Sequence, residues 1–100
     1  MEFTAAELDT STEGVIRIAG DLTFQTVPAL REPLVRALVA CNGSCRIDLE
    51  SVGRVDSSAL SLWLVCQREA GRQGIELTLV HPPEGFRSIA DLVGLDGGWQ

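Results

Sequence analysis

The residues best suited to chemistry lie in the run VDSSAL, where Asp56, Ser57 and Ser58 stand directly before a mostly apolar segment. Aspartate and serine are typical of a helix amino terminus, where a side-chain oxygen accepts a hydrogen bond from an unpaired backbone amide. Capping explains one such residue and leaves the others unexplained. The free amides and the helix dipole also favour an anion, including a phosphate carried on Ser57. The run therefore indicates either a helix start alone or a surface that contacts another protein.

A catalytic role for Ser57 would need a base, and the single histidine, His81, follows an expected strand and precedes Pro82. The chain has no nucleophile-elbow glycine pattern and no glycine-rich phosphate loop with its lysine. The sequence therefore predicts a protein that is not an enzyme.

The three cysteines are Cys41, Cys45 and Cys66, and their spacing with His81 matches no paired zinc-ligand pattern. The three cysteines are better explained as small, buried, apolar side chains. We therefore expect no metal and no cofactor. An odd number of cysteines and the lack of a recognisable secretion signal predict a reducing, cytoplasmic location.

Length and composition predict one domain over residues 1–100, since 45% apolar residues suffice for a core. The net charge is -6 and the eight Lys and Arg are scattered, which argues against nucleic acid and anionic lipid as partners. A basic protein surface would suit the chain better. No apolar run approaches the roughly 18 residues that span a bilayer, so no direct membrane insertion is expected.

Hydrophobic periodicity in the first half predicts a hairpin of two strands, FTAAEL and VIRIAGDL, followed by a helix. Leu30, Leu34, Leu38 and Cys41 fall near helical spacing. Because Pro33 lacks the amide that a helix interior needs, regular helix is expected only from around Glu32.

The second half predicts strands at CRIDLE and IELTLV, with a long helix from about Ser57 to Arg72 between them, closed by Gly74. A last helix follows Pro82 and is stopped by Gly94, with Phe86, Ile89, Ala90 and Val93 on one stripe. Alternating helices and strands imply parallel neighbours. The expected fold class is α/β, with a four-stranded mixed sheet and about three helices.

A helical wheel of the long helix predicts which of its side chains leave the core. The apolar face holds Leu60, Trp63, Leu64, Cys66 and Ala70, together with Gln67. Leu62 and Val65 fall on the opposite, polar face with Ser58 and Ser61. Two apolar side chains beside the serines suggest contact with another protein, and packing under a neighbouring loop is the alternative.

The run CRIDLESVGRVDSSALSLWLVCQREAGRQGIELTLV resembles the centre of a STAS domain. The preceding GDLT and the final PPEGFRSIADLVGLDG extend the resemblance from Val15 to Leu95. This family includes the bacterial anti-sigma factor antagonists and the small STAS subunit of the Mla phospholipid transporter. In the antagonists, the first hydroxyl after the aspartate is phosphorylated by a partner kinase, and that position is Ser57 here.

The resemblance implies one of two functions, and we favour the transporter subunit. It would bind and stabilise or regulate the ABC transporter ATPase, cytoplasmic and peripheral at the inner membrane through that partner. The alternative is an anti-sigma factor antagonist that an anti-sigma serine kinase switches by phosphorylating Ser57. The expected partner-binding residues are Ser57, Ser58, Ser61, Leu62 and Val65, with Arg87 and Asp91 from the last helix.

Overall fold

The computed structural model of the chain describes residues 5–92. Its strands are β1 (Glu7–Asp9), β2 (Val15–Leu22), β3 (Ser44–Val55) and β4 (Glu76–Val80). Its helices are α1 (Val27–Val39), α2 (Ser57–Gln73) and α3 (Glu84–Leu92). The predicted order of strands and helices is confirmed, although β3 continues beyond the expected CRIDLE segment as far as Val55.

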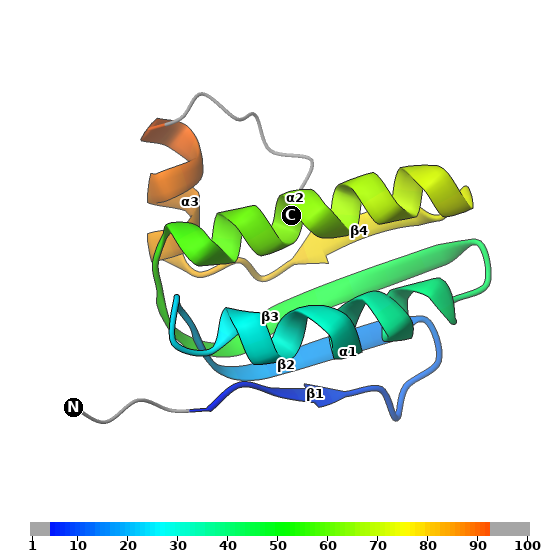
Figure 1. Ribbon diagram of the computed structural model, residues 1–100, viewed down its shortest axis with the longest axis horizontal. Coiled ribbons are helices and arrows are strands. Elements are labelled where there is room, and N and C mark those ends of the chain that lie inside the picture. Colours follow the sequence, from blue (N-terminus) through cyan, green and yellow to red (C-terminus); the bar gives the residue numbers. More distant parts are fainter. Residues whose placement is uncertain (1–4, 93–100) are drawn as a thin grey trace.

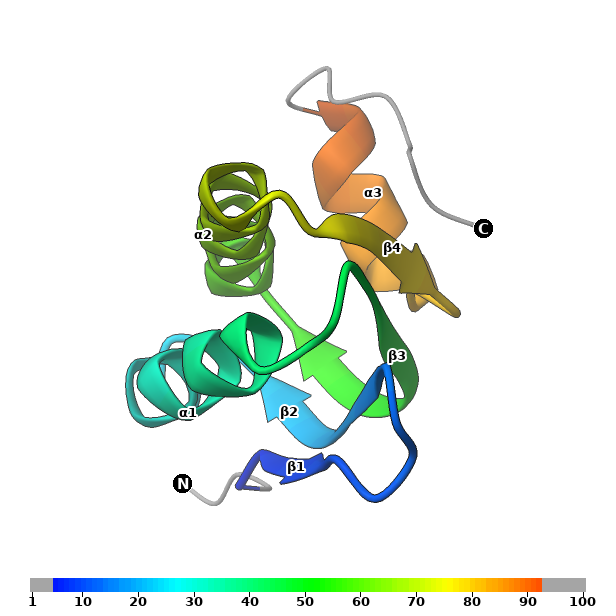
Figure 2. The same ribbon diagram turned by 90° about the vertical axis from the view of Figure 1, so that its right-hand side faces the viewer.

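The strands form one four-stranded sheet in the order β1-β2-β3-β4. β1 pairs antiparallel with β2, whereas β2 with β3 and β3 with β4 are parallel, so the predicted mixed sheet is confirmed. The crossover helices α1 and α2 lie on the same face of the sheet, and α3 stands beside α2 (Figure 1, Figure 2). Because β2 and β3 are parallel, both end at one edge of the sheet, where α1 and α2 begin.

The core lies between the sheet and α1 and α2, because strand side chains alternate between the two faces. Ile16 and Ile18 of β2, and Cys45, Ile47 and Leu49 of β3, point into it and are almost fully buried. Burial raises the pKa of the Cys66 thiol on α2 to about 12. Cys45 and Cys66 are thus small core side chains, as predicted, and Cys41 is half-buried.

Helix α1 begins at Val27, so the expectation of a start near Glu32 is wrong. Pro28 occupies the first turn, where a missing amide is harmless, and Pro33 lies inside the helix. Packing explains why the helix continues through Pro33. Leu30, Leu34 and Leu38 are all buried at four-residue spacing, and this burial outweighs the lost backbone hydrogen bond.

Helix α2 is rotated relative to the predicted wheel. Leu62, expected outside the core, is only 3% exposed, whereas Leu64, expected inside, is 41% exposed. Gln67 is exposed and Val65 half-buried. The buried face runs through Ala59, Trp63, Cys66 and Ala70. Helices α1 and α3 and strand β4 all pack against α2, so Leu62 on the flank of this face is enclosed. The buried face is therefore turned from the predicted one, because the elements packed against α2 decide which of its flanks is covered.

The last helix follows its predicted stripe as far as the structure describes it. Phe86 and Ala90 are buried and Ile89 is half-buried, while Val93 and Gly94 lie outside the described residues. None of the helices within residues 5–92 is long and apolar enough to cross a membrane.

We predict that Leu62→Ala and Leu64→Ala differ sharply in stability. Truncating the buried Leu62 leaves a cavity and should lower the free energy of unfolding by about 2–5 kcal/mol. Leu64 is half in water, so its truncation should change this free energy by about 0.5 kcal/mol. Urea unfolding of both variants measures the difference, and equal losses would contradict the observed rotation of α2.

Gly20 in β2 permits a close approach of the segment that precedes β1. Its φ is 100°, and a Cβ at this position would lie 2.3 Å from the carbonyl oxygen of Ala5. We expect Gly20→Ala to destabilise the fold by about 2 kcal/mol or more. The exposed Gly71 of α2 is the matched control, because a Cβ there meets nothing within 4 Å. Gly71→Ala should stabilise the helix by about 0.5–1 kcal/mol, and thermal unfolding measures both changes.

Candidate functional site

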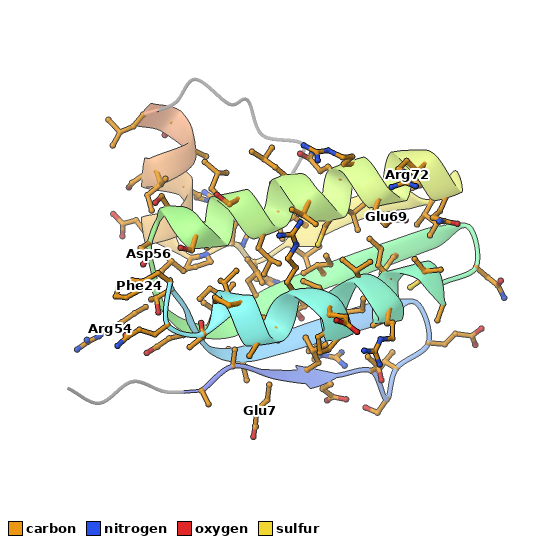
Figure 3. The ribbon with its side chains drawn as sticks, in the orientation of Figure 1. Glu7, Phe24, Arg54, Asp56, Glu69 and Arg72 are labelled. Carbon is orange, nitrogen blue, oxygen red and sulfur yellow. The ribbon has the colours of Figure 1, made fainter. Side chains whose placement is uncertain are left out.

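The candidate site lies where β2 and β3 end and the two crossover helices begin. The β2–α1 loop carries Phe24, the end of β3 carries Arg54, and Asp56 lies between β3 and α2. Figure 3 shows Phe24, Arg54 and Asp56 together at this end of the molecule. The VDSSAL run is therefore brought against a loop more than 30 residues earlier in the chain.

Asp56 joins the two parts of this site through its carboxylate. Oδ1 accepts a hydrogen bond of 2.8 Å from the Ser58 amide and so caps α2. Oδ2 accepts a bond of 3.0 Å from the Phe24 amide in the β2–α1 loop. The backbone amide of Asp56 also donates to the Leu22 carbonyl at 3.2 Å. One residue therefore starts the helix and fixes the loop beside it.

A second aspartate, Asp21, also links the β2–α1 loop with the end of β3. It is only 7% exposed, and its Oδ1 accepts a hydrogen bond of 3.0 Å from the Arg54 amide. A Cβ on Gly53 would lie 3.0 Å from that oxygen, so glycine permits the approach. The buried Thr26 hydroxyl donates to the Asp21 carbonyl at 2.7 Å. Among residues 5–92 no buried side-chain polar atom lacks a hydrogen-bond partner, so the arrangement is tightly specified.

Because Asp56 caps α2, none of the serines is needed as the cap. Ser57 and Ser61 are exposed and Ser58 is half-buried. No hydrogen bond within residues 5–92 engages the hydroxyl of Ser57 or Ser61. Ser57 therefore presents a free hydroxyl at the amino terminus of α2, beside the positive end of the helix dipole.

The remaining predicted contact residues fall into three groups. Leu62 does not belong to the exposed surface, because it is buried in the core, whereas Val65 is half-buried and reaches solvent in part. Arg87 and Asp91 are exposed on α3. The first turn of α3 adjoins the end of β3, since a Cβ on Gly85 would lie 2.8 Å from Val55 Cγ2. The start of α3 therefore borders the same end of the molecule as the start of α2 (Figure 1).

The structure adds a residue that the sequence analysis missed. Phe24 is 70% exposed, which is unusual for a large aromatic side chain, and its amide is bound to Asp56. A signal was present in the sequence, because Phe24 directly follows GDLT, a part of the family resemblance, and no helical pattern requires an aromatic there.

The single histidine lies on the other side of the sheet from the serines. His81 Nδ1 is 3.0 Å from Asp48 Oδ1, and Asp48 points away from the helices because Ile47 and Leu49 fill the core. Burial alone would raise the pKa of Asp48, but hydrogen bonds from the Glu50 amide and His81 bring it below its usual value. His81 therefore contacts Asp48, which also pairs with Arg17, and the sheet separates His81 from Ser57. No group of three possible metal ligands occurs within residues 5–92.

Comparison with known proteins agrees with this fold. Solved structures with the same fold include the anti-sigma factor antagonist SpoIIAA of Bacillus in its unphosphorylated form, with a TM-score of 0.74 and 22% identity over 96% of this chain and 86% of that chain. An anti-sigma factor antagonist from Mycobacterium paratuberculosis gives a TM-score of 0.72 and 19% identity over 91% of this chain and 78% of that chain. No curated protein matches the chain.

At these identities, the solved structures show a shared fold. The family model described as "Mlab, STAS domain" matches residues 6–98, which is nearly the whole chain. Its match covers the mixed sheet and the serine-bearing start of α2. The chain belongs to the STAS domain family, of the Mlab type.

Proposed function

We propose that this chain is a non-catalytic STAS subunit that binds and stabilises or regulates the ATPase of an inner-membrane ABC phospholipid transporter. In this role it lies in the cytoplasm and reaches the membrane only through its partner. The Mlab type of the matching family favours the transporter over other STAS functions. The contact is made by Ser57, Ser58, Ser61 and Val65, with Arg87 and Asp91 from α3.

The observation that carries the proposal is that Asp56 alone caps α2. A serine needed only to begin the helix would be engaged with backbone amides, yet the hydroxyl of Ser57 is free and exposed. Around it, the loop and the helix start are held by Asp56 and Asp21, so the surface is preorganised. A preorganised surface binds a partner with little loss of conformational entropy.

A role without catalysis agrees with the chemistry around Ser57. The sheet lies between His81 and this serine, and Asp56 already uses both carboxylate oxygens as hydrogen-bond acceptors. A serine nucleophile needs a base within hydrogen-bond reach to remove its proton. The free hydroxyl is therefore better suited to contact than to attack.

An anti-sigma factor antagonist is the second candidate, and the accessibility of Ser57 favours it. A kinase needs an exposed hydroxyl, and the amides at the start of α2 favour the phosphate that it would add. SpoIIAA, which shares the fold, is known in a phosphorylated form. In this function the partner would be an anti-sigma serine kinase, and phosphorylation of Ser57 would switch the complex.

We predict that Ser57→Ala keeps the complex with the ATPase and Ser57→Glu disrupts it. Ser57→Ala removes a hydroxyl that caps nothing, so the free energy of unfolding should change by about 0.5 kcal/mol at most. Ser57→Glu places an unpaired charge in the contact, which should weaken binding by about 2–5 kcal/mol. Calorimetry with the purified ATPase of the same host, and thermal unfolding of each variant, measure these effects.

Asn42→Asp is the control, because it adds one negative charge in the turn before β3, at the opposite end of that strand from Ser57. It should bind the ATPase as the unaltered chain does. Retention of the ATPase by Ser57→Glu would remove Ser57 from the interface. Phosphorylation of Ser57 by a serine kinase of the same host, without ATPase binding, would favour the antagonist instead.

A further inference from the structure

Two exposed apolar side chains lie beside the free serines, and neither belongs to the contact expected from the sequence. Phe24 of the β2–α1 loop is 70% exposed and Leu64 of α2 is 41% exposed. Together with Ser57 and Ser61 they form what we call the docking strip. Single exposed apolar residues are ordinary on protein surfaces. A partner is indicated only if the backbone of this strip is fixed and the charges beside it are unpaired.

Phe24 is held rigidly although its ring faces water. Its amide donates a hydrogen bond of 3.0 Å to Asp56 Oδ2. The Thr23 amide before it donates to Thr26 Oγ1 at 3.0 Å. The Gln25 amide after it donates to Thr23 Oγ1 at 3.3 Å. Three successive backbone amides are therefore fixed by side-chain oxygens. An aromatic ring on such a loop loses little entropy on binding, which is the property of an interface anchor.

Leu64 shares one face of α2 with both serines. Ser57, Ser61, Leu64 and Arg68 are spaced by four, three and four residues, which places them in one row along the helix. All four are exposed. The row begins next to Asp56, so the strip runs continuously from the Phe24 loop onto α2.

Two arginines without ion-pair partners flank the strip, in contrast to the acidic charge of the chain as a whole. Arg54 and Arg68 are exposed, and neither guanidinium pairs with a carboxylate anywhere in residues 5–92. The carboxylate of Asp56, at the start of the strip, already accepts two hydrogen bonds. The net charge of -6 suggests a basic partner surface. Arg54 and Arg68, however, would be complemented by acidic groups on the part of the partner that faces the strip.

We propose that the docking strip is the anchor of the partner contact, with Phe24 inserted into an apolar socket of the partner and with an acidic rim whose carboxylates face Arg54 near that socket and Arg68 about three turns further along α2. This inference rests on the proposed function and names the chemistry of the partner's surface. A second copy of the chain is a poorer occupant. A symmetric contact through this strip would bring the unpaired arginines together without a free carboxylate in the strip to receive them.

The test measures binding of the purified ATPase of the same host, and of a purified anti-sigma serine kinase of that host, to single variants by calorimetry. Phe24→Ala should weaken the complex at least about thirtyfold, as is usual for an interface anchor, and Leu64→Ala should weaken it as well. Val39→Ala is the matched control, since Val39 is 44% exposed at the far end of α1. It should bind like the unaltered chain, and all three variants should melt near the unaltered temperature.

A second pair of variants tests the proposed acidic rim of the partner. Arg68→Glu should weaken the complex and reduce its sensitivity to salt, because an attraction between exposed charges is screened by ions. Arg46→Glu makes the same change on the open face of the sheet, opposite the helices, and should leave binding intact. Equal effects of the two substitutions would overturn the acidic rim.

The outcomes separate this inference from the proposed function. Loss of kinase binding in Phe24→Ala, with no ATPase binding by the unaltered chain, would uphold the strip and replace the transporter function. Tight binding of the ATPase by Phe24→Ala would overturn the strip and leave the transporter function standing. Binding of neither probe by the unaltered chain, or a dimer of the unaltered chain that Phe24→Ala dissolves, would overturn the strip.

Discussion

The carboxylate of Asp56 is the constraint on which the rest of the site depends. One oxygen completes the amino terminus of α2 and the other holds the Phe24 amide of the β2–α1 loop. Helix starts leave backbone amides that need acceptors, and a single carboxylate meets this need on two segments. Because Asp56 fills the capping role, Ser57 is left with an exposed hydroxyl. The surface that we assign to a partner is thus a consequence of which residue caps the helix.

This arrangement is possible because β2 and β3 are parallel neighbours. Parallel strands end at the same edge, so the loops that follow them meet there, and open α/β sheets place their binding sites at such edges. The buried Asp21 reinforces the junction by receiving the Arg54 amide. A rigid junction presents Phe24 to solvent without burying it, and the same rigidity keeps Ser57 beside it. Fold and candidate function therefore share one set of hydrogen bonds.

The net charge of the whole chain did not predict the charges on the surface that we assign to a partner. A net charge of -6 argued for a basic partner, yet Arg54 before Ser57 and Arg68 on the same row of α2 have no carboxylate partners among residues 5–92. Electrostatic attraction between exposed groups fades within about 10 Å in salt, so the local arginines matter more to a contact than distant acidic residues. The acidic groups instead include Asp48, which pairs with Arg17 and His81 on the opposite face of the sheet.

The sequence by itself determined the order of the elements, the mixed sheet, the start of α2 after Asp56 and its end at Gly74, because these follow from local periodicity, capping and turn chemistry. Only the tertiary structure decided that Leu62 is buried and Leu64 exposed, because the buried arc of a helix is set by the layers packed on it. It also decided that α1 continues through Pro33, which packing of three leucines supports. The place of Phe24 beside Ser57 depends on a hydrogen bond across 32 residues, and no local pattern encodes such a contact.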